Sequence, residues 1–181
     1  MITLPDTPRD ARFRLGAAVV HPRYGAGVVT GRQRCAVTGA IRDYLEIRIE
    51  HEDMRVLVPE DAVDRVGLRS VMDDGMLSEV LGVLRETPLP VARPWNARHK
   101  SYRRRMADGD VLEIAALVRD LEGRSSDHNG LLSTIERQLL HNCRQQLVSE
   151  MAVAMRLAPE DAEARLDSLV GHGQAPGREA A

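Results

Sequence analysis

The length, composition and cysteine content of the chain exclude several classes of protein. Its 181 residues allow one large domain or two small ones, and an apolar share of 43% suffices for a core in either case. No run of about 18 apolar residues occurs, and the two cysteines, Cys35 and Cys143, form no C-x-x-C pair. We therefore expect a cytoplasmic protein with no membrane contact, no disulfide framework and no zinc knuckle.

The N-terminal part of the sequence has the pattern of a small β domain. Residues 1–11 are polar and contain prolines, so we expect a disordered tail there. Short runs rich in β-branched residues follow at 17–20, 27–30, 44–49 and 54–58. Apolar and polar residues alternate within 44–49, which is the period of a half-buried strand. We predict a strongly bent sheet or a five-stranded barrel over residues 12–69.

One glycine-rich segment of this part could be mistaken for a phosphate-binding loop. Tyr24-Gly25-Ala26-Gly27 is followed by Val28-Val29, with no Lys-Ser/Thr and no helix start. A tight hairpin between two strands is the better interpretation.

From residue 73 the apolar period becomes helical. The first helix carries its apolar stripe between Met76 and Leu84, and the prolines at 88, 90 and 94 prevent it from continuing. A second helix is predicted from Pro94 to about Ala107. Asp110 is a candidate N-cap for a third helix.

The rest of the helical part is delimited by a capping motif and a proline. Ser133 and Glu136 have the S-x-x-E spacing of a capping box, and apolar residues continue beyond them at helical spacing for about six turns. Pro159 begins a last short helix. We predict an all-α domain over residues 73–171, followed by a frayed tail over 172–181.

The positive charge of the chain is concentrated in the second predicted helix. Residues 87–107 contain no Asp or Glu but carry six basic residues: Arg93, Arg98, Lys100, Arg103, Arg104 and Arg105. An ordinary solvated helix face mixes both signs, so this charge is expected to be hard to neutralise within the chain. The pattern favours phosphate binding. Trp95, at the front of this helix, is the only tryptophan and could act as a wedge against a base step or as a packing residue.

No catalytic or metal-binding pattern accompanies this charge. The six histidines never occur in H-x-x-x-H or H-x-x-E-H pairs, and Cys143 lies on an apolar helix stripe where a buried thiol is usual. We expect no cofactor, no metal, no small-molecule ligand and no enzymatic activity.

Several segments resemble the CarD/CdnL family of bacterial RNA polymerase-binding regulators. In the N-terminal half they are Phe13–Val29, Tyr44-Leu45, Val56–Pro59 and Val66–Arg69. In the C-terminal half they are Pro94–Lys100, Asp108–Asp110, Val118–Leu121 and Leu132–Arg137. The first of these segments also resembles the polymerase-interacting domain of transcription-repair coupling factors, whereas the helical half points to CarD/CdnL.

The resemblance implies an α+β multidomain protein with an N-terminal Tudor-like β-barrel and a C-terminal all-α helical domain. The barrel of the family docks on the RNA polymerase β subunit, and the helical domain contacts promoter DNA at the upstream edge of the bubble and stabilises the open complex. The family's tryptophan falls on Trp95, and its basic companions fall on Arg98 and Lys100. With Arg103, Arg104 and Arg105 they make up the expected DNA-binding set.

The expected polymerase-binding residues depart from the family pattern. Arginines that some members use correspond here to Cys35 and Leu57, so we expect Arg34 and Arg55, with Leu57, to meet the polymerase. The protein is expected to act as a monomer, associated with the nucleoid through the polymerase. The alternative is a general nucleic-acid binder independent of polymerase, which the comparable numbers of acids and bases in residues 13–69 disfavour.

Overall fold

The computed structural model describes residues 2–3, 10–36, 39–49, 54–89, 94–107, 109–126 and 132–170, with side chains at all of these except 2, 3, 95 and 107. The chain divides into two compact units. Unit 1 comprises Met1–Asp73 and Ser149–Pro159, and unit 2 comprises Asp74–Val148 and Glu160–Ala181.

Unit 1 is built on an antiparallel sheet. Its strands are β1 (Ile2–Thr3), β2 (Ala18–His21), β3 (Gly25–Ala36), β4 (Ile41–Ile49), β5 (Met54–Pro59) and β6 (Arg69–Ser70). The strand order is β5-β4-β3-β2-β6, with β1 paired to β3. The short helices η1 (Ala11–Phe13), η2 (Glu60–Ala62) and α1 (Val63–Val66) flank the sheet in sequence.

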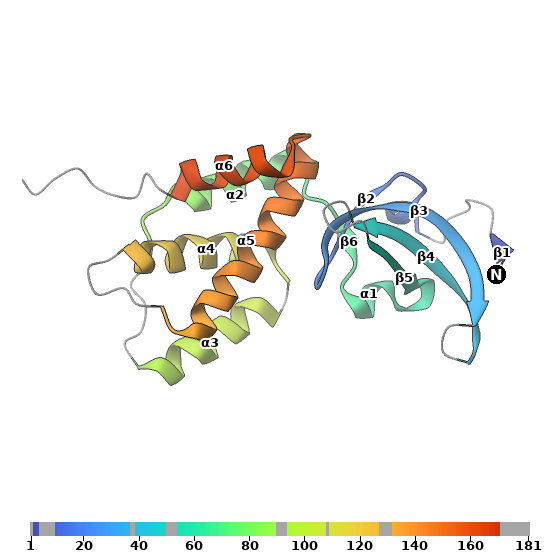
Figure 1. The fold of residues 1–181 in the computed structure, drawn as a ribbon, viewed down its shortest axis with the longest axis horizontal. Coiled ribbons are helices and arrows are strands. Elements are labelled where there is room, and N and C mark those ends of the chain that lie inside the picture. Colours follow the sequence, from blue (N-terminus) through green and yellow to red (C-terminus); the bar gives the residue numbers. More distant parts are fainter. Residues whose placement is uncertain are drawn as a thin grey trace, which may run out of the picture. The chain divides into compact units, whose positions relative to one another are not determined.

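The predicted barrel is confirmed only as a bent sheet. Figure 1 shows β3 as a long curved strand that spans the sheet. The pairing path ends at β5 on one side and at β6 on the other, and no pairing joins these two strands within the described residues. The described part of unit 1 is therefore an open antiparallel sheet, and the helices of unit 2 follow it in sequence.

The core of unit 1 lies on the face of the sheet that the alternating pattern predicts. Leu45, Ile47 and Ile49 of β4 are all at most 1% exposed, and they pack in one cluster with Phe13 of η1. Arg32 of β3 lies on this face too, where it donates to the Phe13 carbonyl oxygen at 2.9 Å. The guanidinium also pairs with Glu60 at 3.3 Å, which compensates the burial of its charge.

The glycine-rich segment forms the expected hairpin. His21 of β2 pairs with Gly25 of β3, and Gly25 adopts a φ of 78°, which glycine accommodates without strain. Gly27 has a different role. A Cβ atom at this position would lie 2.5 Å from the carbonyl oxygen of Arg48, so only glycine allows β3 and β4 to approach this closely.

The N-terminal segment differs in part from the disordered tail expected for residues 1–11. Ile2 and Thr3 pair with Arg34 and Gln33 as β1, and the side chain of Asp10 caps η1. A two-residue strand depends on backbone pairing with a distant strand, so it leaves no periodic signal in the sequence. The expected C-terminal tail, 172–181, lies outside the described residues.

Unit 1 also contains residues from far along the chain. Ser149 Oγ accepts a hydrogen bond from the Ala26 N–H at 3.1 Å. The fully buried Glu150 carboxylate binds the Arg69 guanidinium through two hydrogen bonds of 2.6 and 2.7 Å, and it accepts a third from the Met72 N–H at 2.9 Å. The segment Ser149–Pro159 thus holds the β6 end of the sheet, a contribution absent from the expected domain over residues 12–69.

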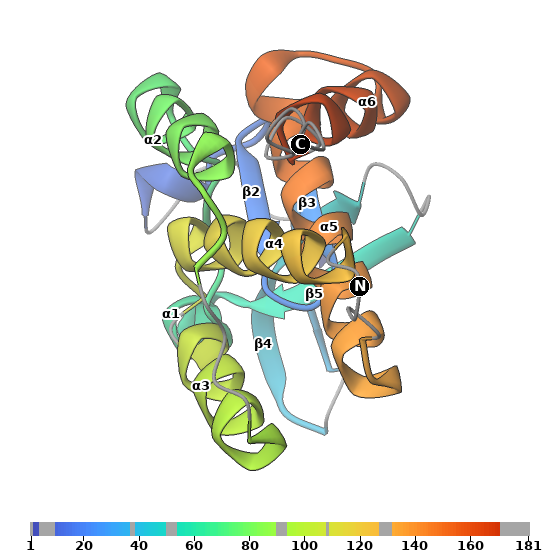
Figure 2. The same ribbon diagram turned by 90° about the vertical axis from the view of Figure 1, so that its left-hand side faces the viewer.

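Unit 2 is helical. Its elements are α2 (Asp74–Arg85), α3 (Trp95–Ala107), α4 (Val111–Ser126), α5 (Thr134–Met155, whose last residues belong to unit 1) and α6 (Pro159–Val170). Figure 2 shows α4 between α2 and α3. No helix among the described residues is long and apolar enough to span a membrane.

The helix starts and buried faces of unit 2 agree with the sequence signals. Asp110 Oδ1 accepts from the Leu112 N–H at 2.9 Å, and Ser133 and Glu136 form the reciprocal bonds of a capping box at 2.9 and 3.2 Å. Ile114, Leu117, Val118 and Leu121 of α4 are buried, at helical spacing. Cys143 is fully buried on α5, and burial raises the pKa of its thiol to about 11.

Replacing Gly27 by Ala tests the close approach of β3 and β4. We expect Gly27→Ala to destabilise the protein by about 1–3 kcal/mol, because the added methyl group overlaps the backbone of β4. Urea unfolding followed by circular dichroism measures this loss. Gly31→Ala in the same strand is the control, because its Cβ would meet only Glu46 Oε2, at 3.8 Å. Equal effects of the two substitutions would contradict this account.

Candidate nucleic-acid interface

The basic run of α3 is divided between two sides of the helix. Arg98 and Arg105 are separated by seven residues, or about two turns, so they share one face, which is turned toward neighbouring helices. Lys100, Arg103 and Arg104 are exposed. The expectation that the whole run is hard to neutralise within the chain is therefore wrong for Arg98 and Arg105.

Arg98 is held by a carboxylate at the start of α5. Its Nε donates to Glu136 Oε1 at 2.9 Å, and the side chain of Glu136 is only 3% exposed. The same oxygen accepts from Arg124 of α4 at 3.1 Å and from the Tyr102 hydroxyl at 3.4 Å. Glu136 is also the acid of the capping box, so one side chain caps α5 and joins it to α3 and α4.

The ionisation of this cluster follows from its contacts. Burial alone would raise the pKa of Glu136, but hydrogen bonds from the Ser133 N–H and Arg98 outweigh it, so the pKa lies below its ordinary value. Burial and the charge of Glu136 raise the pKa of Tyr102. Glu136 is therefore ionised and Tyr102 protonated at neutral pH, as their hydrogen bond requires.

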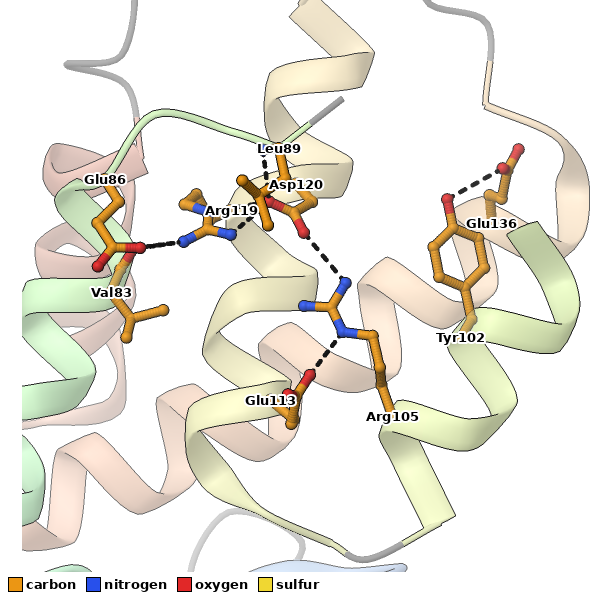
Figure 3. Close-up of polar contacts among 9 residues, drawn as sticks. All are labelled: Val83, Glu86, Leu89, Tyr102, Arg105, Glu113, Arg119, Asp120 and Glu136. Atoms are coloured by element: carbon orange, nitrogen blue, oxygen red, sulfur yellow. Dashed lines mark hydrogen bonds and ion pairs between the residues drawn. The ribbon is translucent and has the colours of Figure 1, made fainter. Parts of the chain in front are cut away.

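Arg105 is held by α4 (Figure 3). Its Nε donates to Glu113 at 2.6 Å, and its Nη1 donates to Asp120 at 3.1 Å. Burial alone would lower the pKa of Arg105, but these two bonds outweigh it and raise the pKa. Asp120 also binds its neighbour Arg119, which reaches Glu86 beyond the end of α2 at 2.6 Å. Alternating charges thus connect α2, α4 and α3.

The outward face of α3 keeps its positive charge. Lys100, Arg103 and Arg104 occupy positions i, i+3 and i+4, so they are neighbours on the helix surface. Within the described residues no carboxylate forms an ion pair with any of them. A phosphate chain could meet all three cations without displacing an internal partner.

The side chain of Trp95 lies outside the described part of the structure. The backbone of Trp95 is the first residue of α3, and the Pro94 carbonyl oxygen accepts from the Arg98 N–H at 3.2 Å as the helix begins. The choice between a wedge and a packing residue therefore stays a prediction.

The expected polymerase-binding residues lie on two faces of the sheet. Leu57 of β5 pairs with Glu46, and Arg55 pairs with Arg48, so both share the face opposite the core. Arg55 is exposed and contacts Glu46 at 3.1 Å. Arg34 pairs instead with Asp43, on the side of the sheet that carries Leu45, and it binds the Asp43 carboxylate at 2.6 and 3.0 Å. The structure brings Arg55 and Leu57 together but not Arg34.

A cleft of about 510 Å³ opens beside the ion pairs that connect α2, α4 and α3. Its walls include Ser101 and Arg104 of α3, Leu112 of α4 and the exposed Leu89. Within the described residues no group of three or more His, Cys, Asp or Glu side chains is placed to hold a metal ion, in this cleft or elsewhere.

The low pKa of Glu136 predicts how the stability of unit 2 depends on pH. A carboxylate whose pKa is lower in the folded than in the unfolded state stabilises the fold above its unfolded pKa, and this contribution is lost as the pH falls below about 5. Glu136→Gln should therefore cost about 1–3 kcal/mol at pH 7. The difference from the original chain should shrink between about pH 5 and pH 3, as measured by thermal unfolding.

The matched control is Glu79→Gln, because Glu79 is exposed on α2 and forms no ion pair with a described residue. It should leave the stability nearly unchanged at every pH. A pH-independent loss in Glu136→Gln would mean that the shape of the side chain, and not its charge, holds α5.

Comparisons with known proteins agree with this arrangement. Residues 13–72 match the family model of the CarD-like/TRCF RID domain, and residues 79–167 match that of the CarD C-terminal domain. The chain is also similar to "Putative transcription factor YdeB" of Bacillus subtilis (strain 168). The two are 26% identical over 141 residues, which cover 78% of this chain and 91% of the relative. Because these two CarD-type domain models together match most of the chain, the chain belongs to the CarD/CdnL family of transcription regulators.

Proposed function

We propose that this regulator joins RNA polymerase to promoter DNA and stabilises the open complex, without enzymatic activity, cofactor or small-molecule ligand. The observation that carries the proposal is the acid-free outward face of α3, formed by Lys100, Arg103 and Arg104. The family match of residues 13–72 supports polymerase docking, and the match of residues 79–167 supports the DNA-contacting role of the helices.

On the DNA side, the outward cations bind phosphates and Trp95 contacts a base step. Phosphate contacts give affinity and register without reading sequence, whereas a ring wedged at a base step resists closure of the bubble. Arg98 and Arg105 were expected in the same DNA-binding set, but their ion pairs hold them against neighbouring helices, so their role in this proposal is to orient α3.

On the polymerase side, the bent sheet of unit 1 docks on the β subunit, as the Tudor-like domain of the family does. Arg55 and Leu57 supply an exposed cation and an adjoining apolar side chain on β5, at one end of the strand order. Arg34 contributes more weakly, because an acidic partner must replace its two bonds to Asp43, of 2.6 and 3.0 Å, whereas Arg55 has a single bond of 3.1 Å to Glu46.

The mechanism requires only differential binding. A monomer that holds both polymerase and melted DNA favours the open over the closed complex by its difference in affinity for the two, plausibly about 1–3 kcal/mol. Such a protein resides in the cytoplasm and associates with the nucleoid through the polymerase.

A nucleic-acid binder that does not need polymerase is the second candidate. It would require unpaired positive charge on unit 1 as well. Instead, three cations of its sheet are paired with nearby acids, in Arg34–Asp43, Arg42–Asp61 and Arg55–Glu46. This pairing favours polymerase docking.

The outward face of α3 should set the salt dependence of DNA binding. Replacing Lys100, Arg103 and Arg104 together by Ala should flatten the slope of log affinity against log salt by roughly 0.9 for each phosphate that no longer meets a cation. Fluorescence anisotropy with a labelled duplex that contains a short bubble measures this slope.

Arg85→Ala is the control, because Arg85 is an exposed arginine of the same unit on α2. It should leave the slope unchanged. If the triple substitution also leaves the slope unchanged, the outward face of α3 is not the DNA-binding surface.

Polymerase docking is tested by capture of core RNA polymerase on the immobilised full chain, with and without nuclease. Capture should survive nuclease treatment if the polymerase is bound directly. The double substitution Arg55→Glu and Leu57→Asp should weaken it by about tenfold or more, since it reverses a charge and removes an apolar contact.

Arg65→Glu on α1 makes the same charge change at another exposed position of unit 1 and should have no effect. Capture that disappears with nuclease would instead favour the polymerase-independent binder. Release by Arg34→Glu, with no effect of the double substitution, would move the docking site to the other face of the sheet.

A further inference from the structure

Asp120 of α4 is a buried carboxylate whose contacts lead to the DNA-facing helix. Its side chain is 3% exposed. Oδ1 accepts from the Leu89 N–H at 3.0 Å and from Arg119 Nε at 2.9 Å, and Oδ2 accepts from Arg105 at 3.1 Å. The carboxylate therefore holds both α3 and the backbone of the segment that connects α2 to α3 (Figure 3).

The connecting segment meets α4 at a second point. Gly123 lies one turn beyond Asp120, and a Cβ atom there would clash with the ring of Pro88. Glycine lowers the stability of a helix interior by about 1 kcal/mol relative to alanine, so its presence here allows Pro88 to approach α4. Pro88 and Leu89 thus contact α4 seven and six residues before Trp95, where α3 begins.

Among the described side chains, only that of Asp120 bonds both to the connecting segment and to α3. Arg105 has a further partner in Glu113, and Arg119 has one in Glu86. Both of these carboxylates are more exposed, at 46% and 63%, and neither is bonded to Leu89. Replacing the Asp120 carboxylate by an amide would leave each arginine one carboxylate partner. Only one oxygen of the side chain would then remain to accept from Leu89, Arg119 and Arg105, so at least one of these bonds would be lost.

We propose that Asp120 is a positioning residue for DNA binding, which fixes Leu89 and α3 on α4 and so sets the position of Trp95 and the outward cations. The proposal rests on the proposed function, because Asp120 would raise DNA affinity by presenting α3 to DNA in one arrangement. Preorganisation of this kind raises affinity by reducing the ordering that binding requires.

The test is Asp120→Asn in the full chain, which keeps the size of the side chain and removes its charge. We expect DNA affinity to fall by about three- to tenfold with an unchanged salt slope, because the outward cations remain. The only tryptophan of the chain is Trp95, so intrinsic fluorescence reports on this position alone. The decay of its anisotropy in the free protein should become faster.

Gly123→Ala perturbs the same segment without touching a charge, and it should reproduce both effects while leaving helix content intact. Glu113→Gln is the matched control, because it also removes a partner of Arg105 but does not contact Leu89. It should leave the anisotropy decay of Trp95 unchanged.

The outcomes separate this proposal from the proposed function. If the original chain does not bind DNA, the proposed function is wrong. The anisotropy decay of Trp95 in the free variants would still decide whether Asp120 and Gly123 position α3. An unchanged anisotropy decay in both Asp120→Asn and Gly123→Ala overturns the proposal. If Asp120→Asn unfolds, Gly123→Ala alone decides it.

Discussion

The ion pairs between α3 and its neighbours are the interactions on which the arrangement of unit 2 depends. A helix with a uniformly basic sequence cannot bury one side unless carboxylates compensate that side, since an unpaired buried charge is strongly unfavourable. Glu136 and Asp120 provide this compensation for Arg98 and Arg105. The period of 3.6 residues then places the remaining cations on the opposite side, where they stay available.

Signals that act over a few residues made much of this fold predictable from the sequence. The capping box of Ser133 and Glu136, the Asp110 cap and the alternation in β4 all reflect contacts between neighbours in the chain or on one face, and the structure contains each of them. The extension of β3 beyond residue 30 was missed, because its polar residues carry no apolar alternation.

The partners of the basic helix could not be predicted in the same way. Arg98 and Glu136 are 38 residues apart, and Arg105 and Asp120 are 15 apart, so only the packing of three helices brings them together. A signal did exist for Glu136, whose place in a capping box fixes its side chain at the start of a helix. The sequence placed Asp120 on α4, but nothing in it indicated the bond to the Leu89 N–H.

The chemistry of arginine explains why the basic residues divide as they do. The Arg105 guanidinium reaches Glu113 with one nitrogen and Asp120 with another, a fork that the point charge of a lysine does not reproduce. Lys100, the only lysine, stands on the outward face, where no described carboxylate pairs with it. Phosphate binding accepts either kind of cation there, whereas the inward positions require the planar fork. The same residue type therefore orients the helix on one side and is available for DNA on the other.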